Sequence, residues 1–386
     1  QDFKILKNIN TAANTAGSEV SGIVVIGSTI YFRAFKPTTG FELWKSDGSV
    51  TGTQLVKDIC IGSCGSLPQN FINVSGTIFF TAKNVSHGNE LWKTDGTPDG
   101  TVMVKDINTG GADGNPAYLT NINGVLYFVA TDVAHGTELW KSNGTEDGTM
   151  LVKDINTGTN PSYPHDLVNM NGMLYFSAQD AVNGMELWKS NGTSSGTELL
   201  IDIYTGAIAS NPGNLVNMNG ELYFTATDAT SGTEIWKSNG TAAGTVLLKD
   251  INAGTDNSYP LSLTVVNSTV FFKAYDADNG TELWKTDGTP PGTVLVKDIY
   301  AGSASGNPQY LTNVNGLLYY VASEDVNGTE LWKTDGTAAG TMLVKDIISG
   351  DGSSFPLYLT SVGDKLFFTA QQPATGSELW ISNGTA

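Results

Sequence analysis

A tryptophan recurs every 48 residues along this chain of 386 residues, and the chain contains no other tryptophan. A fixed period of this length is typical of solenoids and propellers, in which each repeat buries its core against its neighbours. The period therefore constrains the fold more than any other feature. The eight tryptophans are Trp44, Trp92, Trp140, Trp188, Trp236, Trp284, Trp332 and Trp380.

The eight copies can be compared position by position within the chain itself. An alanine stands ten residues before each tryptophan, a glycine four residues before it and a glutamate two residues before it. None of these three positions varies among the eight copies. We therefore predict the same local structure in every copy.

Each copy predicts four short strands. In the third copy, apolar and polar side chains alternate over residues 118–123, and residues 125–131 are rich in aromatic and β-branched side chains. Asn123-Gly124 between these segments is typical of a hairpin turn. Residues 137–142 and 149–155 predict the third and fourth strands, joined by the turn 143–148. Four strands in about 48 residues form one propeller blade.

The two ends of the chain complement each other. Residues 3–9 match the fourth strand of the other copies, such as residues 54–59, and the last copy stops at Thr385 before its own fourth strand. We therefore predict an all-β, eight-bladed β-propeller with four antiparallel strands per blade, in which residues 1–10 complete the last blade. Uniform repeats without a linker predict a single domain over residues 1–386.

The net charge and the hydropathy of the chain argue against several classes of binding partner. The 20 Lys and Arg against 38 Asp and Glu give a net charge of −18, which repels nucleic acid and anionic lipid. The sequence contains no run of 18 apolar residues, which a membrane-spanning helix would need. The chain begins at Gln1 rather than Met, as expected after removal of a signal peptide or trimming. We predict a secreted or cell-surface protein, with the periplasm as the alternative.

The two cysteines, Cys60 and Cys64, lie four residues apart in one loop. We predict a local disulfide between them, and free thiols are the alternative. A single pair is a weak indicator of compartment.

The repeat resembles a known motif. The string Ala130-x-Asp132-x3-Gly136-x-Glu-Leu-Trp140 is similar to the tryptophan-docking motif of quinoprotein-like eight-bladed propellers. Over nearly its whole length, the chain resembles secreted bacterial proteins built from tandem ELWxxDGT repeats. The resemblance implies that each indole packs against the next blade, with the small alanine allowing close approach. The alternative role of the indoles is an exposed platform for sugar rings.

Catalysis on a symmetric ring requires residues that break the symmetry. A quinoprotein dehydrogenase would need calcium ligands, a catalytic aspartate and inserted loops, whereas these blades have constant length. His87 and His135 occupy equivalent loop positions, and a third metal ligand is not evident. We predict no catalytic residue, no metal centre and no cofactor. An enzyme acting at the propeller channel, quinoprotein-like or glycan-active, is the alternative.

Acidic or amide residues recur at one loop position. We predict that they cap their own turns through side-chain oxygens. Calcium binding is the alternative, because carboxylates and turn carbonyls suit this cation. The residues are Asn84, Asp132, Asp180, Asp228 and Asp276.

A second period, of 96 residues, appears before the prolines that recur between copies. Alternate copies carry a bulky apolar residue there, namely Leu67, Tyr163, Tyr259 and Phe355. The intervening copies carry Asn115, Asn211 and Asn307. If the bulky residues are exposed, they form equivalent sites on one face, which suits a repetitive ligand such as a polysaccharide. The alternative is a side chain packed under its own loop.

These patterns together favour a multivalent binding or scaffold module, lectin-like or adhesive. The predicted ligand is a polysaccharide or a protein on one propeller face. The candidate binding residues are Tyr163, Tyr259 and Phe355, together with the loop aspartates Asp132, Asp180, Asp228 and Asp276. The sequence indicates no oligomeric state.

Overall fold

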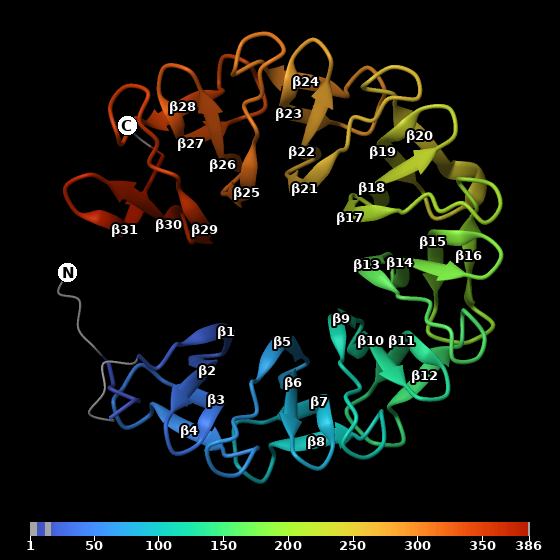
Figure 1. Cartoon of the computed structure of the whole chain (residues 1–386), viewed down its shortest axis with the longest axis vertical. Helices are drawn as coiled ribbons and strands as arrows, with labels where there is room; N and C mark the ends of the chain where they lie inside the picture. Colours follow the sequence, from blue (N-terminus) through green and yellow to red (C-terminus); the bar gives the residue numbers. More distant parts are fainter. Residues whose placement is uncertain (1–5, 12–16, 385–386) are drawn as a thin grey trace. The chain divides into compact units, whose positions relative to one another are not determined.

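The computed structural model describes residues 6–11 and 17–384. Within them the chain forms eight antiparallel sheets, and the only helix is the short 3₁₀ turn η1 (Ala242–Gly244). The sheets are the blades of an eight-bladed β-propeller, so the predicted all-β fold class is confirmed (Figure 1). None of the described residues belong to a helix long and apolar enough to cross a membrane.

Every blade follows the same strand order. The first strands are β1 (Ser21–Ile26), β5 (Gln69–Val74), β9 (Ala117–Ile122), β13 (His165–Met170), β17 (Gly213–Met218), β21 (Leu261–Val266), β25 (Gln309–Val314) and β29 (Leu357–Val362). The second strands are β2 (Thr29–Lys36), β6 (Thr77–Asn84), β10 (Val125–Asp132), β14 (Met173–Asp180), β18 (Glu221–Asp228), β22 (Thr269–Asp276), β26 (Leu317–Glu324) and β30 (Lys365–Gln372).

The outer half of each blade consists of the third and fourth strands. The third strands are β3 (Gly40–Ser46), β7 (Gly88–Thr94), β11 (Gly136–Ser142), β15 (Gly184–Ser190), β19 (Gly232–Ser238), β23 (Gly280–Thr286), β27 (Gly328–Thr334) and β31 (Gly376–Ser382). The fourth strands are β4 (Gln54–Lys57), β8 (Val102–Lys105), β12 (Met150–Lys153), β16 (Thr197–Ile201), β20 (Thr245–Lys249), β24 (Val294–Lys297) and β28 (Met342–Lys345).

The third blade shows how well the residues predicted these strands. The turn after β9 has φ of 52° at Asn123 and 85° at Gly124, which is the type I′ geometry expected of Asn-Gly. The fourth strand is shorter than predicted and ends at Lys153. The reason is that the backbone N–H groups after it turn away from the sheet to bond buried carboxylates, such as Ile155 N to Glu138 Oε2 at 3.1 Å.

Two compact units are defined by the contacts within the chain. One comprises the described residues up to Ala181 together with Trp188–Glu198, and the other comprises Val182–Leu187 and the described residues from Leu199 onward. Within each unit, the first strand of a blade contacts the first strand of the following blade, as β5 contacts β9 and β21 contacts β25 (Figure 1). The apolar core lies between neighbouring blades. In one such cluster, Phe79 and Leu91 of the second blade pack against Phe128, Ala130 and Trp140 of the third.

The eighth blade has three strands among the described residues, in the order β29-β30-β31. The predicted closing segment, residues 1–10, lies half outside the described residues, and its described part forms no strand. Ile9 is nevertheless buried against Phe32, Ala34 and Trp44 of the first blade. Ile59 packs in the same way against the equivalent residues of the second blade. The segment around Ile9 therefore takes the place on the first blade that a preceding blade's last residues take elsewhere.

Candidate binding face of the inter-blade loops

Each inter-blade loop is fixed by a buried glutamate of the repeat. Glu138 in β11 accepts hydrogen bonds from Ile155 N at 3.1 Å, Ser162 N at 3.0 Å and Ser162 Oγ at 2.6 Å. Burial raises the pKa of Glu138 to about 7, and these donors offset part of that shift. Seven of the eight repeat glutamates are fully buried, namely Glu42, Glu90, Glu138, Glu186, Glu234, Glu282 and Glu330.

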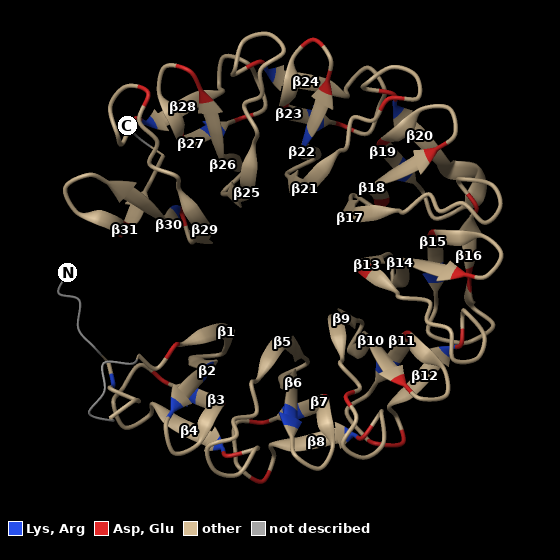
Figure 2. Ribbon diagram, viewed as in Figure 1, with Lys and Arg blue, Asp and Glu red and all other residues tan. Residues whose placement is uncertain are grey.

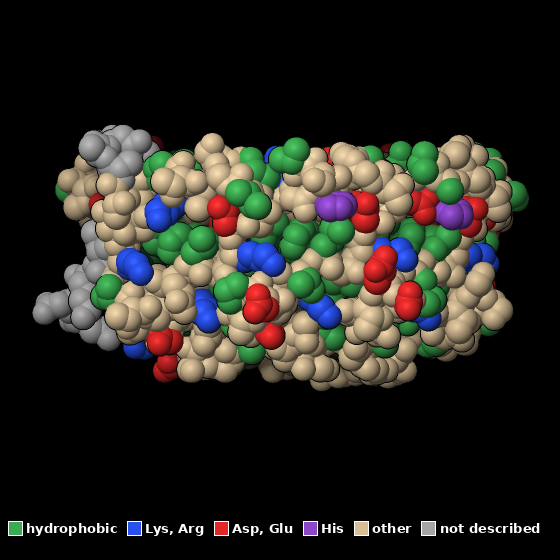
Figure 3. Space-filling view, turned by 90° about the horizontal axis from the view of Figure 1, so that it is seen from below, with side chains coloured by type: hydrophobic (Ala, Val, Ile, Leu, Met, Phe, Trp, Pro, Cys, Tyr) green, Lys and Arg blue, Asp and Glu red, His purple; other side chains and the backbone are tan. Residues whose placement is uncertain are grey.

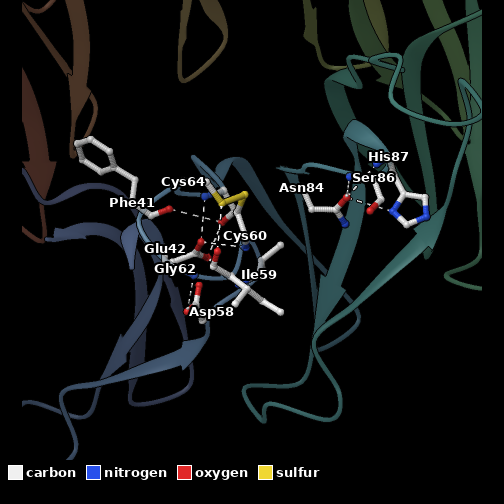
Figure 4. Close-up of a disulfide and its surroundings, with 12 residues drawn as sticks. Phe41, Glu42, Asp58, Ile59, Cys60, Gly62, Cys64, Asn84, Ser86 and His87 are labelled. Carbon is white, nitrogen blue, oxygen red and sulfur yellow. Dashed lines mark hydrogen bonds between the residues drawn. A yellow bond between two sulfur atoms is a disulfide. The ribbon is translucent and has the colours of Figure 1, made fainter. Parts of the chain in front are cut away.

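The first loop carries an additional cross-link. Cys60 and Cys64 form a disulfide with a Cα–Cα separation of 5.7 Å. Glu42 accepts hydrogen bonds from Ile59 N at 3.0 Å and from Cys60 N at 3.1 Å, so the bridge and the carboxylate hold the same turn (Figure 4). Asp58 also accepts a hydrogen bond from Gly62 N at 3.2 Å.

The residue before the recurring proline adopts a left-handed conformation in these loops. Its φ is 46° at Tyr163, 47° at Tyr259 and 45° at Phe355. The backbone is held by the preceding third strand, as in the hydrogen bond from Tyr163 N to Thr137 O at 3.2 Å. The side chains are 53%, 57% and 50% exposed, so half of each apolar surface faces solvent rather than packing under the loop.

Backbone geometry does not account for these aromatic residues. The equivalent Asn115, Asn211 and Asn307 have the same φ, between 45° and 47°. Asparagine adopts left-handed φ readily, whereas a bulky residue pays roughly 1 kcal/mol or more for it. The aromatic side chains at this position therefore cost stability that the loop itself does not require.

A second set of exposed aromatic residues lies three positions further along and was missed from the sequence. Tyr118, Tyr310 and Tyr358 also have left-handed φ, between 53° and 57°, and are all exposed. They occupy a bulge in the first strand, where the register with the second strand shifts. The sequence carries a signal for this position, because the other five copies have Gly22, Asn70, Asp166, Asn214 and Ser262 there. The alternating pattern had assigned Tyr118 to an ordinary strand position.

The loop aspartates bond their own turns. Asp132 Oδ1 accepts hydrogen bonds from the backbone N–H groups of Ala134 at 2.8 Å and His135 at 2.7 Å. Asp132 Oδ2 lies 2.9 Å from His135 Nδ1, and this hydrogen bond raises the pKa of His135. Asp228 and Asp276 accept the equivalent backbone bonds, as does Asn84 beside His87 (Figure 4). Asp180 occupies the same position at the end of β14.

Among the residues that the structure describes, no group of three or more His, Cys, Asp or Glu side chains could hold a metal ion. Strand residues carry most of the lysines, and the acidic side chains lie mainly at turns and strand ends (Figure 2). On the face seen in Figure 3, side chains of both charges are interspersed with neutral ones. No extended patch of one sign gathers on that face.

The tryptophans are buried, and they pack on the side opposite to the one that the resemblance implied. Seven are 4–8% exposed, and Trp380 in the last blade is only partly buried. Trp140 contacts Val104 and Ile107 of the preceding blade rather than the next one. Leu139 and Trp140 are successive residues of β11, so their side chains point to opposite faces of the sheet. The indole takes the face toward the preceding blade. A lysine of the preceding blade lies over the indole in places, as Lys153 Nζ does at 5.9 Å from the Trp188 ring centroid.

Comparisons with known proteins extend to the fold alone. No family model and no curated protein sequence matches the chain. Among solved structures, the computationally designed Ika8 protein is similar with a TM-score of 0.50 at 14% identity, covering 98% of this chain and 99% of that one. A prolyl endopeptidase has a TM-score of 0.49 at 12% identity over 92% of this chain, and a puromycin hydrolase has 0.43 at 12% identity over 93%. The chain spans 54% and 59% of those two enzymes' lengths.

Proposed function

We propose that this protein is a secreted or cell-surface module that binds a polysaccharide multivalently through the aromatic residues of its inter-blade loops. The observation that carries the proposal is the set of half-exposed Tyr163, Tyr259 and Phe355 held at left-handed φ. Asparagine fits that backbone better and occupies it in three of the other blades, as Asn115, Asn211 and Asn307. A side chain that costs stability and faces solvent is typical of a contact surface.

Chemistry supports a carbohydrate ligand. Aromatic rings offer a flat apolar surface for a sugar face, and the tyrosine hydroxyl adds a hydrogen-bonding group. Equivalent sites on alternate blades match the repetition of a polysaccharide, because each bound unit raises the effective concentration of the next. The Cys60–Cys64 disulfide is consistent with an oxidising compartment, which supports the extracellular location.

The test replaces the three aromatic residues by asparagine, which the chain itself uses at this position in three other blades. In the triple variant Tyr163→Asn, Tyr259→Asn and Phe355→Asn, we expect apparent affinity for polysaccharides on a glycan array to fall at least tenfold, because avidity is lost with each site. The melting temperature should stay the same or rise, since asparagine accepts the left-handed backbone. Val133→Asn, at an exposed apolar turn residue, serves as the control. Unchanged array signals in the triple variant would rule the proposal out.

A further inference from the structure

The cavity beside β22 in the sixth blade is where the repeat symmetry breaks. It has a volume of about 660 Å³, within the range that holds small ligands. Its walls come from the loop before β21, from β22 and from the following inter-blade loop. The residues that could contact a ligand there are Asp256, Asn257, Tyr259, Lys273, Tyr275 and Asn307.

Two of these residues are peculiar to this blade. The position of Lys273 is uncharged in the other copies except the first, where Arg33 stands, and Thr225 is its counterpart in the fifth blade. Tyr275 is the only tyrosine at its position, where the fifth blade has Thr227. Lys273 and Tyr275 are two residues apart on β22, so both side chains point to the same face of the strand.

The ammonium group of Lys273 has no partner among the described residues. Arg33 in the first blade donates from Nε to Ser21 Oγ at 3.1 Å and lies 5.2 Å from the Phe41 ring centroid. Lys273 is partly buried, and no described residue forms a hydrogen bond or ion pair with its ammonium group. A partly desolvated ammonium without a partner favours a ligand that supplies an anionic oxygen.

Tyr259, which lines the cavity, is held in place. Asn257 Oδ1 accepts a hydrogen bond from Thr233 N at 2.7 Å, and Asn257 Nδ2 donates to the Tyr259 hydroxyl at 3.0 Å. The equivalent residue in the fourth blade is Pro161, which cannot orient Tyr163 in this way. Tyr259 therefore presents an ordered aromatic surface in the cavity that Lys273 also lines.

We propose that this cavity binds an acidic saccharide residue, with its carboxylate at Lys273 and one face of its ring on Tyr259. The inference rests on the proposed polysaccharide binding and names the ligand class at one blade. The net charge of −18 repels a densely charged polymer at long range, but salt screens this field beyond about 8 Å. The ligand is therefore a largely neutral polysaccharide that carries isolated uronic acid residues.

The experiment compares two soluble oligosaccharides that differ only in one unit, glucuronic acid in the first and glucose in the second. By isothermal titration calorimetry, the wild-type chain should bind the acidic probe roughly tenfold more tightly, as a charge-assisted hydrogen bond requires. Lys273→Thr places the fifth blade's residue at this position, and it should abolish the preference without lowering the melting temperature. Equal affinity for both probes, or a preference that persists in Lys273→Thr, would overturn the inference.

The outcomes separate the two proposals. If wild-type protein binds both probes equally and the triple loop variant loses that binding, polysaccharide binding stands and the acidic site fails. If neither probe nor any array polysaccharide binds, the proposed function fails. A preference for the acidic probe that depends on Lys273 but persists in the triple loop variant, which lacks Tyr259, would overturn the contact between the sugar ring and Tyr259.

Discussion

Single residues of the repeat divide into those that build the interface between blades and those that face solvent. The indole of Trp140 fills the interface between the second and third blades, where it packs with Phe128 and Ala130 of its own blade. Ala130 is fully buried, and a larger side chain there would displace its neighbours from a close-packed interface. The half-exposed Tyr163 and Tyr259 belong to the second class.

Trp140→Ala should lower the free energy of unfolding by about 3–5 kcal/mol, because it removes a large buried side chain and leaves a cavity. Trp380→Ala is the matched comparison, since Trp380 holds the same position in the last blade but is only partly buried. Its substitution should cost less. Chemical denaturation of the two variants measures the difference. Equal losses would contradict the role assigned to burial.

The inter-blade loop is the element that the repeat glutamate controls. One buried carboxylate receives backbone and side-chain donors from both ends of the loop, as Glu234 does from Ile251 N at 2.9 Å and Ser258 N at 2.9 Å. Burial is the largest influence and raises the pKa of Glu234 to about 7. The same value applies to Glu42, Glu90, Glu138 and Glu282.

This raised pKa predicts the sign of the pH dependence of stability. Between pH 4.5, the ordinary pKa of a glutamate, and about pH 7, the folded chain binds more protons at these glutamates than the unfolded chain does. The stabilisation that these buried glutamates provide is therefore fully present below pH 4.5 and is lost as the pH rises through 7. We expect the free energy of unfolding to fall from pH 5 to pH 8 by on the order of 1 kcal/mol per carboxyl group. The melting temperature should fall with it.

The control for this pH profile is Glu378→Gln, because Glu378 holds the same position in the last blade but is exposed. Glu138→Gln should flatten part of the profile, whereas Glu378→Gln should leave it unchanged. Differential scanning calorimetry across this pH range gives the readout. A melting temperature that rises with pH would mean that the hydrogen bonds to the carboxylates outweigh their burial.

At the scale of the whole molecule, stability comes from repeating one interface between neighbouring blades. In such a repeat protein each blade buries its apolar faces against its neighbours. A blade at the end of the row therefore needs another segment to bury its outer apolar face. Lys7 Nζ donates to Val50 O at 3.2 Å and also to Thr53 O. Lys57 Nζ donates to Pro98 O at 3.1 Å and Thr101 O at 2.7 Å in the same way. The segment from Leu6 to Asn10 thus covers the first blade.

Ile9→Ala tests the contribution of this segment. Ile9 is 6% exposed and Ile59 is 7% exposed, each against a tryptophan, alanine and phenylalanine of the repeat. Each substitution should therefore cost about 2–4 kcal/mol of unfolding free energy. Urea denaturation of Ile9→Ala beside Ile59→Ala makes the comparison. If Ile9→Ala alone were neutral, the chain start would contribute nothing to the first blade.

The blade count, the strand order and the turns could be predicted from the residues alone, because these features follow from local chemistry repeated eight times. Asn-Gly selects its turn geometry, and period-two alternation selects the strands. The packing of the folded chain settled which blade each indole contacts and that Tyr163, Tyr259 and Phe355 are half exposed. It also left Lys273 without a partner among the described residues. These depend on how side chains from distant strands meet. The residues alone do not show whether an indole packs against the preceding or the following blade. Both neighbours carry the same residues at the contacting positions, so either arrangement fits the repeat.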